Sequence, residues 1–332
     1  MANQQIFKSL RGTITATAIA VSSMIAIASA ATAVTLKVSV ENLGPSGGSL
    51  LPPIWVAFQD GSFDTFDVGA PASSGIKYMA EDGISGLESN IFGESDFLSN
   101  VLYRVIPKKS TIGGLFAESS AAKNGGVQDL LFPNPADWLY PNAPVAFPGQ
   151  VATKTIELNG DTTSHRYFSY ASYVFPSNDA FISNEKPIEI FDASGKFIGA
   201  DFIVLGNQVL DAGTEVNTED RANIGFPSER GFEFSALGSG IPENGTIQPH
   251  PGFKPLGAGG VLDYTLGGNQ LFANADFKAS GYQVARIKIT EVTKSVPEPS
   301  TTGAIAFGGL LILLRQVRRS MKRNPHLNLS HS

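Results

Sequence analysis

The sequence contains no cysteine, and this absence excludes several kinds of chemistry. Without thiols the chain cannot form disulfide bonds, thiolate zinc sites, iron–sulfur clusters or a cysteine nucleophile. Its folded part must therefore be stabilised by a hydrophobic core, alone or together with a bound metal ion. A body of about 260 residues is large enough to bury such a core.

Histidine is also scarce, with four residues in the chain of 332. Only His165 and His250 lie outside the C-terminal tail. We expect His165, which stands beside Arg166 at the start of a strand, to be a surface residue rather than a catalytic base. The sequence has neither an H-E-x-x-H pattern nor a P-loop, and we expect no enzymatic activity.

Charged residues make up only 16% of the chain, and they are unevenly placed. Residues 34–295 hold 17 of the 24 Lys and Arg residues and 29 of the 30 Asp and Glu residues, which gives this body a net charge of −12. An acidic body argues against nucleic acid as a partner, because that affinity comes mainly from neutralised phosphates. The negative charge of the body favours divalent cations as ligands. The alternative is that this charge only keeps the protein soluble.

A long apolar run is missing too, but a short one marks the N-terminus. Lys8 and Arg11 precede an uncharged apolar stretch, and two Ala-x-Ala patterns follow it, ending at Ala30 and Ala33. This order predicts that residues 1–33 are a signal peptide cleaved after one of those two alanines. The alternative is an uncleaved N-terminal anchor.

The C-terminal residues 296–332 contain a second short apolar run. Pro297-Glu298-Pro299 precedes the apolar segment 301–314, and five basic residues follow between 315 and 323. Fourteen helical residues span about 20 Å, which is short of a hydrocarbon core of about 30 Å. The arrangement resembles the PEP-CTERM sorting signal of Gram-negative bacteria, rather than a plain membrane anchor.

This resemblance implies a cellular location for the protein and a protease as its partner. A membrane protease of the exosortase class would act near Pro297-Glu298-Pro299, after the short C-terminal helix has held the chain transiently in the inner membrane. We therefore expect an exported protein at the cell envelope, the outer surface or the extracellular matrix.

Apolar and polar residues alternate in short runs through the body, a pattern typical of β-strands with one buried face. The runs 34–40 and 284–292 alternate most clearly. Further strands are expected at 52–58, 153–158, 167–175, 188–191 and 196–199. Short strands separated by turns, in a chain with 35 glycines and 20 prolines, predict an all-β fold: an antiparallel β-sandwich over residues 34–295.

Two turn signals in this body predict β-hairpins. Asn159-Gly160-Asp161 would join the two strands that flank it, and Asp192-Ala193-Ser194-Gly195 would join the next two. Residues 76–90 allow one or two short helical turns. Residues 113–148 and 238–260 are rich in Gly, Pro and Asn, and we expect them to form long loops.

Four short motifs follow one another through the body. They are WVAFQDG at 55–61, AEDG at 80–83, PSNDAF at 176–181 after a Ser-Tyr-Ala-Ser strand, and LDAGTE at 210–215. Together they resemble bacterial members of the spondin N-terminal domain family over most of residues 34–293. This resemblance implies a β-sandwich similar to a C2 domain that holds one calcium ion through carboxylates.

Mapped residue by residue, the resemblance implies Asp179 and Asp211 as calcium ligands. The third carboxylate would be Glu157, with Asp161 as its rival, and Asn178 or backbone carbonyls would complete the six to eight oxygen ligands that calcium takes. From the residues alone, Asp179 and Asp211 are equally compatible with ordinary turns.

The sequence thus favours an exported, non-enzymatic, calcium-binding β-sandwich that acts in adhesion or in association with exopolysaccharide or a cell-surface component. Two alternatives stay open: a glycan hydrolase with a pair of carboxylates, and a structural matrix protein without a specific ligand. Exposed aromatic residues near loop ends, such as Tyr167, Tyr170 or Trp138, would favour sugar binding.

Overall fold

The computed structural model describes residues 33–89, 105–133, 137–140, 143–224, 238–266 and 268–292. The signal-peptide residue Ala30, the Pro297-Glu298-Pro299 motif and the apolar segment 301–314 lie outside these ranges, and Ala33 is the first described residue. Within the described ranges, no helix has the length and apolar character needed to cross a membrane.

The described chain is mostly β-structure. Its strands are β1 (Val34–Asn42), β2 (Ile54–Gln59), β3 (Val127–Leu131), β4 (Asp137–Tyr140), β5 (Ala143–Val145), β6 (Val151–Leu158), β7 (Tyr167–Tyr173), β8 (Ala180–Ser183), β9 (Ile188–Glu189), β10 (Ala200–Leu205), β11 (Leu210–Asp211), β12 (Gln248–Pro249), β13 (Thr265–Leu266), β14 (Asn269–Gln270) and β15 (Gln283–Glu291). Its helices are α1 (Ser74–Asp82), α4 (Ile112–Glu118) and α5 (Ser120–Lys123), with short 3-10 turns η1 (Lys108–Ser110), η2 (Gly206–Gln208), η3 (Arg221–Asn223) and η5 (Val261–Asp263).

A four-stranded antiparallel sheet forms one layer, in the order β10-β15-β1-β6. Its central strand β1 pairs with β15 through Leu36 opposite Glu291 and with β6 through Val34 opposite Leu158. Leu36, Val38 and Val40 are buried while the residues between them are mostly more exposed, as the alternating sequence predicts.

A seven-stranded antiparallel sheet forms the second layer, in the order β12-β11-β8-β7-β2-β3, with β9 also paired to β7. Strand β2 is buried on both faces. Val56 and Phe58 face the core between the two sheets, whereas Trp55 and Ala57 face a separate core under the helices. An uninterrupted apolar run is what a strand covered on both sides requires.

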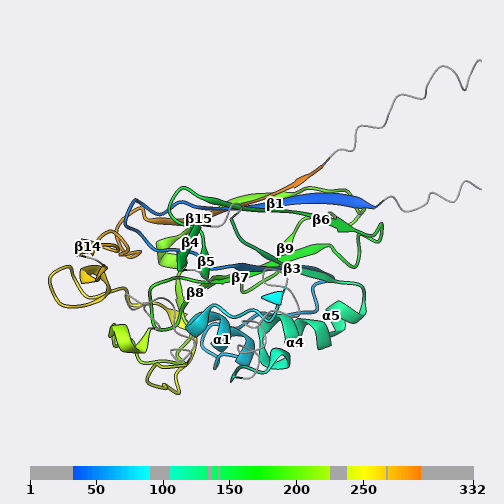
Figure 1. The fold of residues 1–332 in the computed structure, drawn as a ribbon. Helices are drawn as coiled ribbons and strands as arrows, with labels where there is room; N and C mark the ends of the chain where they lie inside the picture. The colour runs from blue at the N-terminus through cyan, green and yellow to red at the C-terminus, as the bar shows by residue number, and fades with distance from the viewer. Residues whose placement is uncertain are drawn as a thin grey trace, which may run out of the picture.

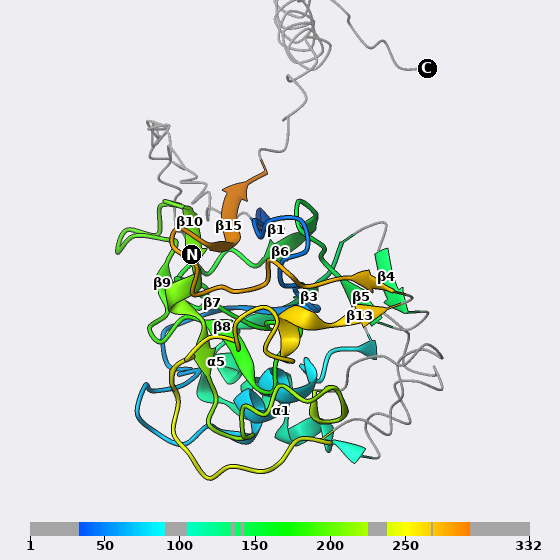
Figure 2. The same cartoon turned by 90° about the vertical axis from the view of Figure 1, so that its left-hand side faces the viewer.

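The helices α1, α4 and α5 form a third layer over the outer face of the seven-stranded sheet, as Figures 1 and 2 show. Ile76 and Met79 of α1 and Phe116 of α4 pack there against Trp55 and Phe181. The helix α1 begins after Ser73, whose hydroxyl accepts a hydrogen bond from the Ile76 N–H, and it ends at Gly83 in the left-handed conformation.

The antiparallel β-sandwich is thus confirmed, and so is a short helix that overlaps 76–90, although α1 begins two residues earlier. Two local predictions are wrong. The strands flanking Asn159-Gly160-Asp161 do not form a hairpin: β6 pairs with β1 in one sheet and β7 pairs with β2 in the other. The expected loop 113–148 contains most of α4, all of α5 and strands β3 to β5. Residues 238–260 are largely loop, as expected.

The second expected hairpin is present in a short form. Phe191 bridges Phe197, and the Asp192 N–H donates to the Lys196 carbonyl across the turn. The strand before it, β9, pairs with β7 rather than continuing as a long hairpin arm. The polar residues 192–195 therefore predicted correctly that the chain reverses here. The strand partner of β9, which is β7, is set by the sheet.

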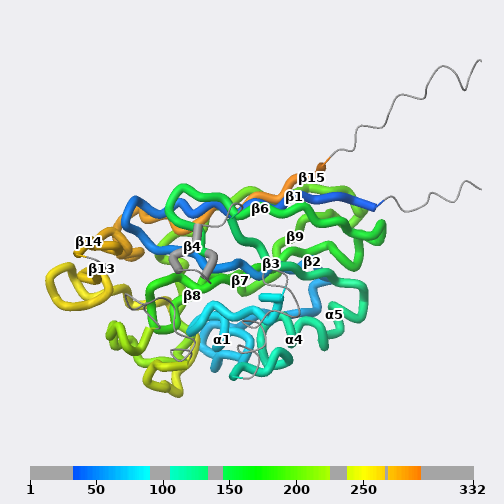
Figure 3. The backbone as a smooth tube through the Cα atoms, viewed as in Figure 1, coloured from blue at the N-terminus to red at the C-terminus, as the bar shows by residue number. Residues whose placement is uncertain are grey.

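Both termini of the sandwich leave from the same end of the molecule (Figures 1 and 3). The first residues of β1 pair with the last residues of β6 and β15. The other end carries β13 and β14, and there Tyr173, the last residue of β7, packs with Val261 and Tyr264. The two ends of β7 are about 20 Å apart, given the rise per residue of a strand.

Candidate metal site

Asp179 lies just before β8, at the end of the sandwich away from the termini. Its side chain has 0% of its surface exposed. Its Oδ2 atom accepts hydrogen bonds from the backbone N–H groups of Thr214, at 2.7 Å, and Glu215, at 3.1 Å. Its buried Oδ1 atom has no hydrogen-bond partner among the described residues. A carboxylate oxygen left alone in a protein interior is costly, which marks this atom as a position for a ligand.

Asp211 is next to Asp179 because β11 pairs with β8, placing Asp211 opposite Ala180. Its Oδ1 atom accepts from the Gly213 N–H at 2.7 Å, and its Oδ2 atom accepts from the Asn217 side-chain amide. The turn depends on Gly213, which has φ of +65°; a Cβ there would lie 2.7 Å from the backbone N of Thr246. This glycine therefore lets the turn after Asp211 pack closely against residues 245–246.

Three more acidic residues lie at this end of the molecule. Glu215 follows the same turn and is 4% exposed. Glu81 and Asp82 come from the last turn of α1, where Glu81 pairs with Lys77 and Asp82 Oδ1 accepts from the Gly238 N–H at 3.1 Å. We call Glu81, Asp82, Asp179, Asp211 and Glu215 the acidic end cluster.

Burial disfavours the ionised form of Asp82, Asp179, Asp211 and Glu215, and repulsion from a neighbouring carboxylate adds to this for all but Asp211. Burial, followed by the charge of Asp211, raises the pKa of Asp179 to about 7. Burial, followed by the charge of Glu81, raises the pKa of Glu215 to about 8, and burial raises the pKa of Asp82 to about 7. Burial also raises the pKa of Asp211. A cation at this place would remove the repulsion and favour the ionised form of all four.

The structure does not bring Glu157 to the two aspartates. Glu157 lies on β6, which belongs to the other sheet, and its side chain is exposed. Its rival Asp161 lies in the connection before β7, at the opposite end of that strand from the acidic end cluster. Both residues lie away from the two aspartates because β6 and β7 pair into different sheets instead of forming the expected hairpin.

Asn178 does not point a free oxygen toward the aspartates either. Its Oδ1 atom accepts from the Glu219 N–H at 3.1 Å, so the amide holds the loop after residue 217. The carboxylates that do gather near Asp179 come from two motifs already noted in the sequence, AEDG at 80–83 and LDAGTE at 210–215. Their shared position depends on the packing of α1 over the sheet, which no local pattern reveals.

The residues at this end fit a calcium ion in part. Among the described residues, no three acidic or histidine side chains stand close enough together to hold a metal ion as they are oriented. Calcium, however, also takes backbone carbonyls, hydroxyls and waters as ligands. Asp179 Oδ1 supplies a buried, unpartnered oxygen, and the neighbouring Asp211 and Glu215 supply the negative charge.

The two histidines of the body lie outside the acidic end cluster. The expectation that His165 is a surface residue is wrong: it has 0% exposure, and its ring nitrogens lie 2.9 Å from the carbonyl oxygens of Asp161 and Gly125. His250 is also buried, packed against Phe253 and Phe277, and burial lowers its pKa to about 3. Both histidines therefore have structural positions.

The aromatic residues considered for sugar binding are placed differently from one another. Tyr170 is buried between the sheets, whereas Tyr167 is half-buried beside a pocket at the end of the molecule from which the termini leave. The side chain of Trp138 lies outside the described part of the structure.

In comparisons with known proteins, no family model and no curated protein matches this chain.

Proposed function

We propose that the protein is an exported, non-enzymatic β-sandwich that binds one calcium ion at the acidic end cluster and acts in adhesion or polysaccharide association. The observation that carries the calcium proposal is Asp179, a fully buried carboxylate with one oxygen lacking a partner, beside two further buried carboxylates. A hard cation with oxygen ligands is the ligand that this chemistry favours.

Burial at this site favours an ion over a glycan substrate. Groups with raised pKa values, such as Asp179 and Glu215, are the kind that act as general acids in glycoside hydrolysis. Here both side chains are at most 4% exposed, so a sugar ring cannot reach them in this conformation. A single ion needs only a narrow path, and this supports the binding proposal over the hydrolase alternative.

The location in the proposal comes from the ends of the chain. The signal peptide 1–33 would direct export, and Pro297-Glu298-Pro299 would be processed by an exosortase-type protease. Since β1 begins and β15 ends at one end of the sandwich, a chain still tethered through residues 301–314 would present the acidic end cluster away from the membrane.

The test is the melting temperature of the full chain, purified in mild detergent, with EDTA and with millimolar calcium. An ion at about 100 times its dissociation constant stabilises the native state by about 2.7 kcal/mol, which raises the midpoint by several degrees for a domain of this size. We expect this increase to disappear in Asp179→Asn.

A matched control is Asp201→Asn. Asp201 is an exposed aspartate on β10 that pairs with Arg286, outside the acidic end cluster. This variant should keep the full response to calcium. A calcium response that survives in Asp179→Asn would place the ion elsewhere. No response in the wild-type chain would favour the structural matrix protein without a specific ligand.

A further inference from the structure

A short segment of the chain lies against the acidic end cluster. Residues 238–245 include a stretch that runs antiparallel to the turn 213–216, which carries Glu215 and whose N–H groups bind Asp179. We call residues 238–245 the strap. Its backbone hydrogen bonds with the turn, of 2.8 or 2.9 Å, run from the N–H groups of Val216, Glu243 and Gly245 to the carbonyls of Ile241, Thr214 and Gly213, respectively.

The strap lies directly on the carboxylate of Glu215. A Cβ atom added to Gly240 would stand 1.9 Å from Glu215 Cδ and 1.9 Å from its Oε2 atom, so the contact requires a glycine. Glu215 is 4% exposed and Asp179 is 0% exposed. Because both residues are buried, part of their cover must move for an ion to enter, and the strap is the part that lies against Glu215.

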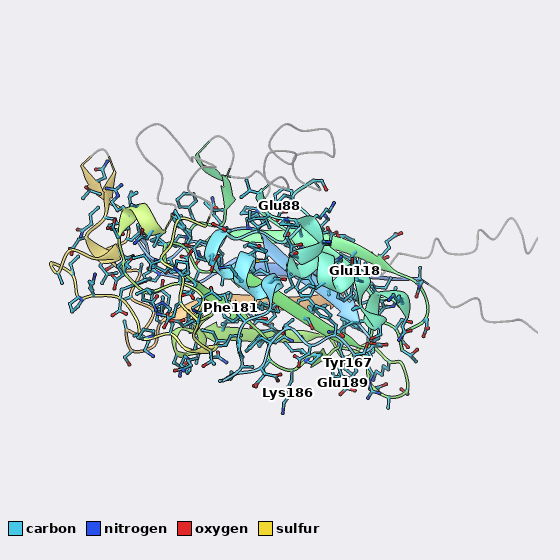
Figure 4. All side chains as sticks on the ribbon, turned by 90° about the horizontal axis from the view of Figure 1, so that it is seen from below. Glu88, Glu118, Tyr167, Phe181, Lys186 and Glu189 are labelled. Atoms are coloured by element: carbon cyan, nitrogen blue, oxygen red, sulfur yellow. The ribbon has the colours of Figure 1, made fainter. Side chains whose placement is uncertain are left out.

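Few side chains hold the strap in place. Residues 241–244 are exposed, so they add no packing to the backbone bonds. The Gly238 N–H donates to Asp82 Oδ1 at 3.1 Å, at the end of α1. Just beyond the strap, Ile247 is buried in the core under the helices together with Phe181 of β8, which is labelled in Figure 4. A segment with few buried apolar contacts opens at a lower free energy than the core does.

The closed strap leaves polar atoms at this end unsatisfied. Among the described residues, three buried oxygen atoms here have no hydrogen-bond partner: Asp179 Oδ1, Asp82 Oδ2 and, on the strap itself, Ser239 Oγ. Buried polar atoms in native proteins are nearly always partnered. Carboxylate and hydroxyl oxygens are ligands that a hard cation accepts. The closed strap therefore has the chemistry of a cover that closes over a cation.

We infer that the strap opens to admit the cation and closes over it, and that the bound cation keeps the strap closed. Without an ion, closure buries the carboxylate of Glu215 near that of Asp179, and the burial of like charges opposes closure. With an ion, this repulsion is removed and the population shifts toward the closed strap. The inference rests on the proposed calcium site and adds how that site is opened and closed.

The first test is hydrogen–deuterium exchange of the full chain in mild detergent at pH 8, followed by mass spectrometry. The N–H groups of Glu243 and Gly245 report on the strap, and those of residues 36–40 in β1 report on the sandwich. In EDTA the strap amides should exchange at least roughly tenfold faster than those of β1, because the strap opens locally. Calcium at about 100 times its dissociation constant should slow the strap amides by up to about 100-fold.

The second test uses the contact between Gly240 and Glu215. In Gly240→Ala the added methyl group collides with the carboxylate, so the strap cannot close fully over an ion. Stopped-flow mixing of the calcium-loaded chain with a fluorescent chelator should show calcium release at least about tenfold faster than in the wild type. Asn244→Ala, an exposed change on the same strap, should release calcium at the wild-type rate. Unchanged exchange in β1 shows that both variants are folded.

The outcomes separate this inference from the calcium proposal. Strap amides that exchange in EDTA as slowly as those of β1 would overturn it, because the strap would then open only with the whole sandwich, and this result needs no variant. Wild-type calcium release from folded Gly240→Ala would overturn it as well. If calcium raises the melting temperature but does not slow the strap amides, the calcium site stands and the role of the strap falls. If calcium changes neither, both proposals fail.

Discussion

Asp179→Asn should have opposite effects on stability with and without calcium. In chelator at pH 8 the wild-type chain holds Asp179 ionised, buried and with one oxygen unpartnered. A pKa raised from 3.8 to about 7 corresponds to a destabilisation of roughly 4 kcal/mol, at about 1.4 kcal/mol for each factor of ten in proton affinity. The asparagine carries no charge and escapes this destabilisation.

The asparagine has a cost of its own. Its oxygen can still accept from the N–H groups of Thr214 and Glu215, but its buried NH₂ group gains no acceptor, which costs about 1–3 kcal/mol. The variant should therefore be more stable than the wild type by about 1–3 kcal/mol in EDTA at pH 8. In saturating calcium it should be less stable, because it lacks the ligand.

The sign of the pH dependence follows from the raised pKa. A carboxyl group whose pKa is higher in the folded state binds more protons there, so the chain without calcium loses stability as pH rises from about 4 to about 7. At pH 5 most of the destabilisation is absent, and the asparagine should give no advantage. Calcium should stabilise the wild type more at pH 8 than at pH 5.

The assay is urea unfolding followed by circular dichroism at pH 5 and pH 8, each with EDTA and with calcium. Asp201→Asn is the control, since its exposed charge should leave all four values within about 0.5 kcal/mol of the wild type. If Asp179→Asn is equally destabilising in all four conditions, Asp179 is a turn residue and the reasoning from its buried charge fails.

Two further predictions concern other parts of the chain. His165→Ala should lower the free energy of unfolding by about 2–4 kcal/mol, because it removes the buried contacts of the ring with the carbonyls of Asp161 and Gly125 and leaves a cavity. The exposed Glu118→Ala should change it by less than about 0.5 kcal/mol. A value below about 1 kcal/mol for His165→Ala in urea unfolding would contradict the buried position. Replacing Pro297-Glu298-Pro299 with three alanines should keep the protein in the membrane fraction on immunoblots, and release at the wild-type rate would refute the sorting signal.

Local patterns predicted much of the sandwich. The alternation in 34–40 and 284–292 identified β1 and β15 because period-two burial is a property of the strand itself. They failed at Asn159-Gly160-Asp161, where a turn signal was interpreted as a hairpin although the chain crosses between sheets. They also failed at α4 and α5, whose glycine-containing, short sequences have no strong helical period of their own and are fixed by packing on Trp55 and Ala57.

For the sites, the sequence by itself determined the chemistry that is possible. Composition and residue order alone show that the chain has no cysteine, an acidic body, two basic ends and loops rich in aspartate. Which carboxylates share a site was decided by the tertiary structure: Asp179 meets Asp211 through the pairing of β8 and β11, while Asp161 joins Asp60 at the other end. Partners distant in sequence meet only through sheet register and layer packing, and these depend on the whole chain.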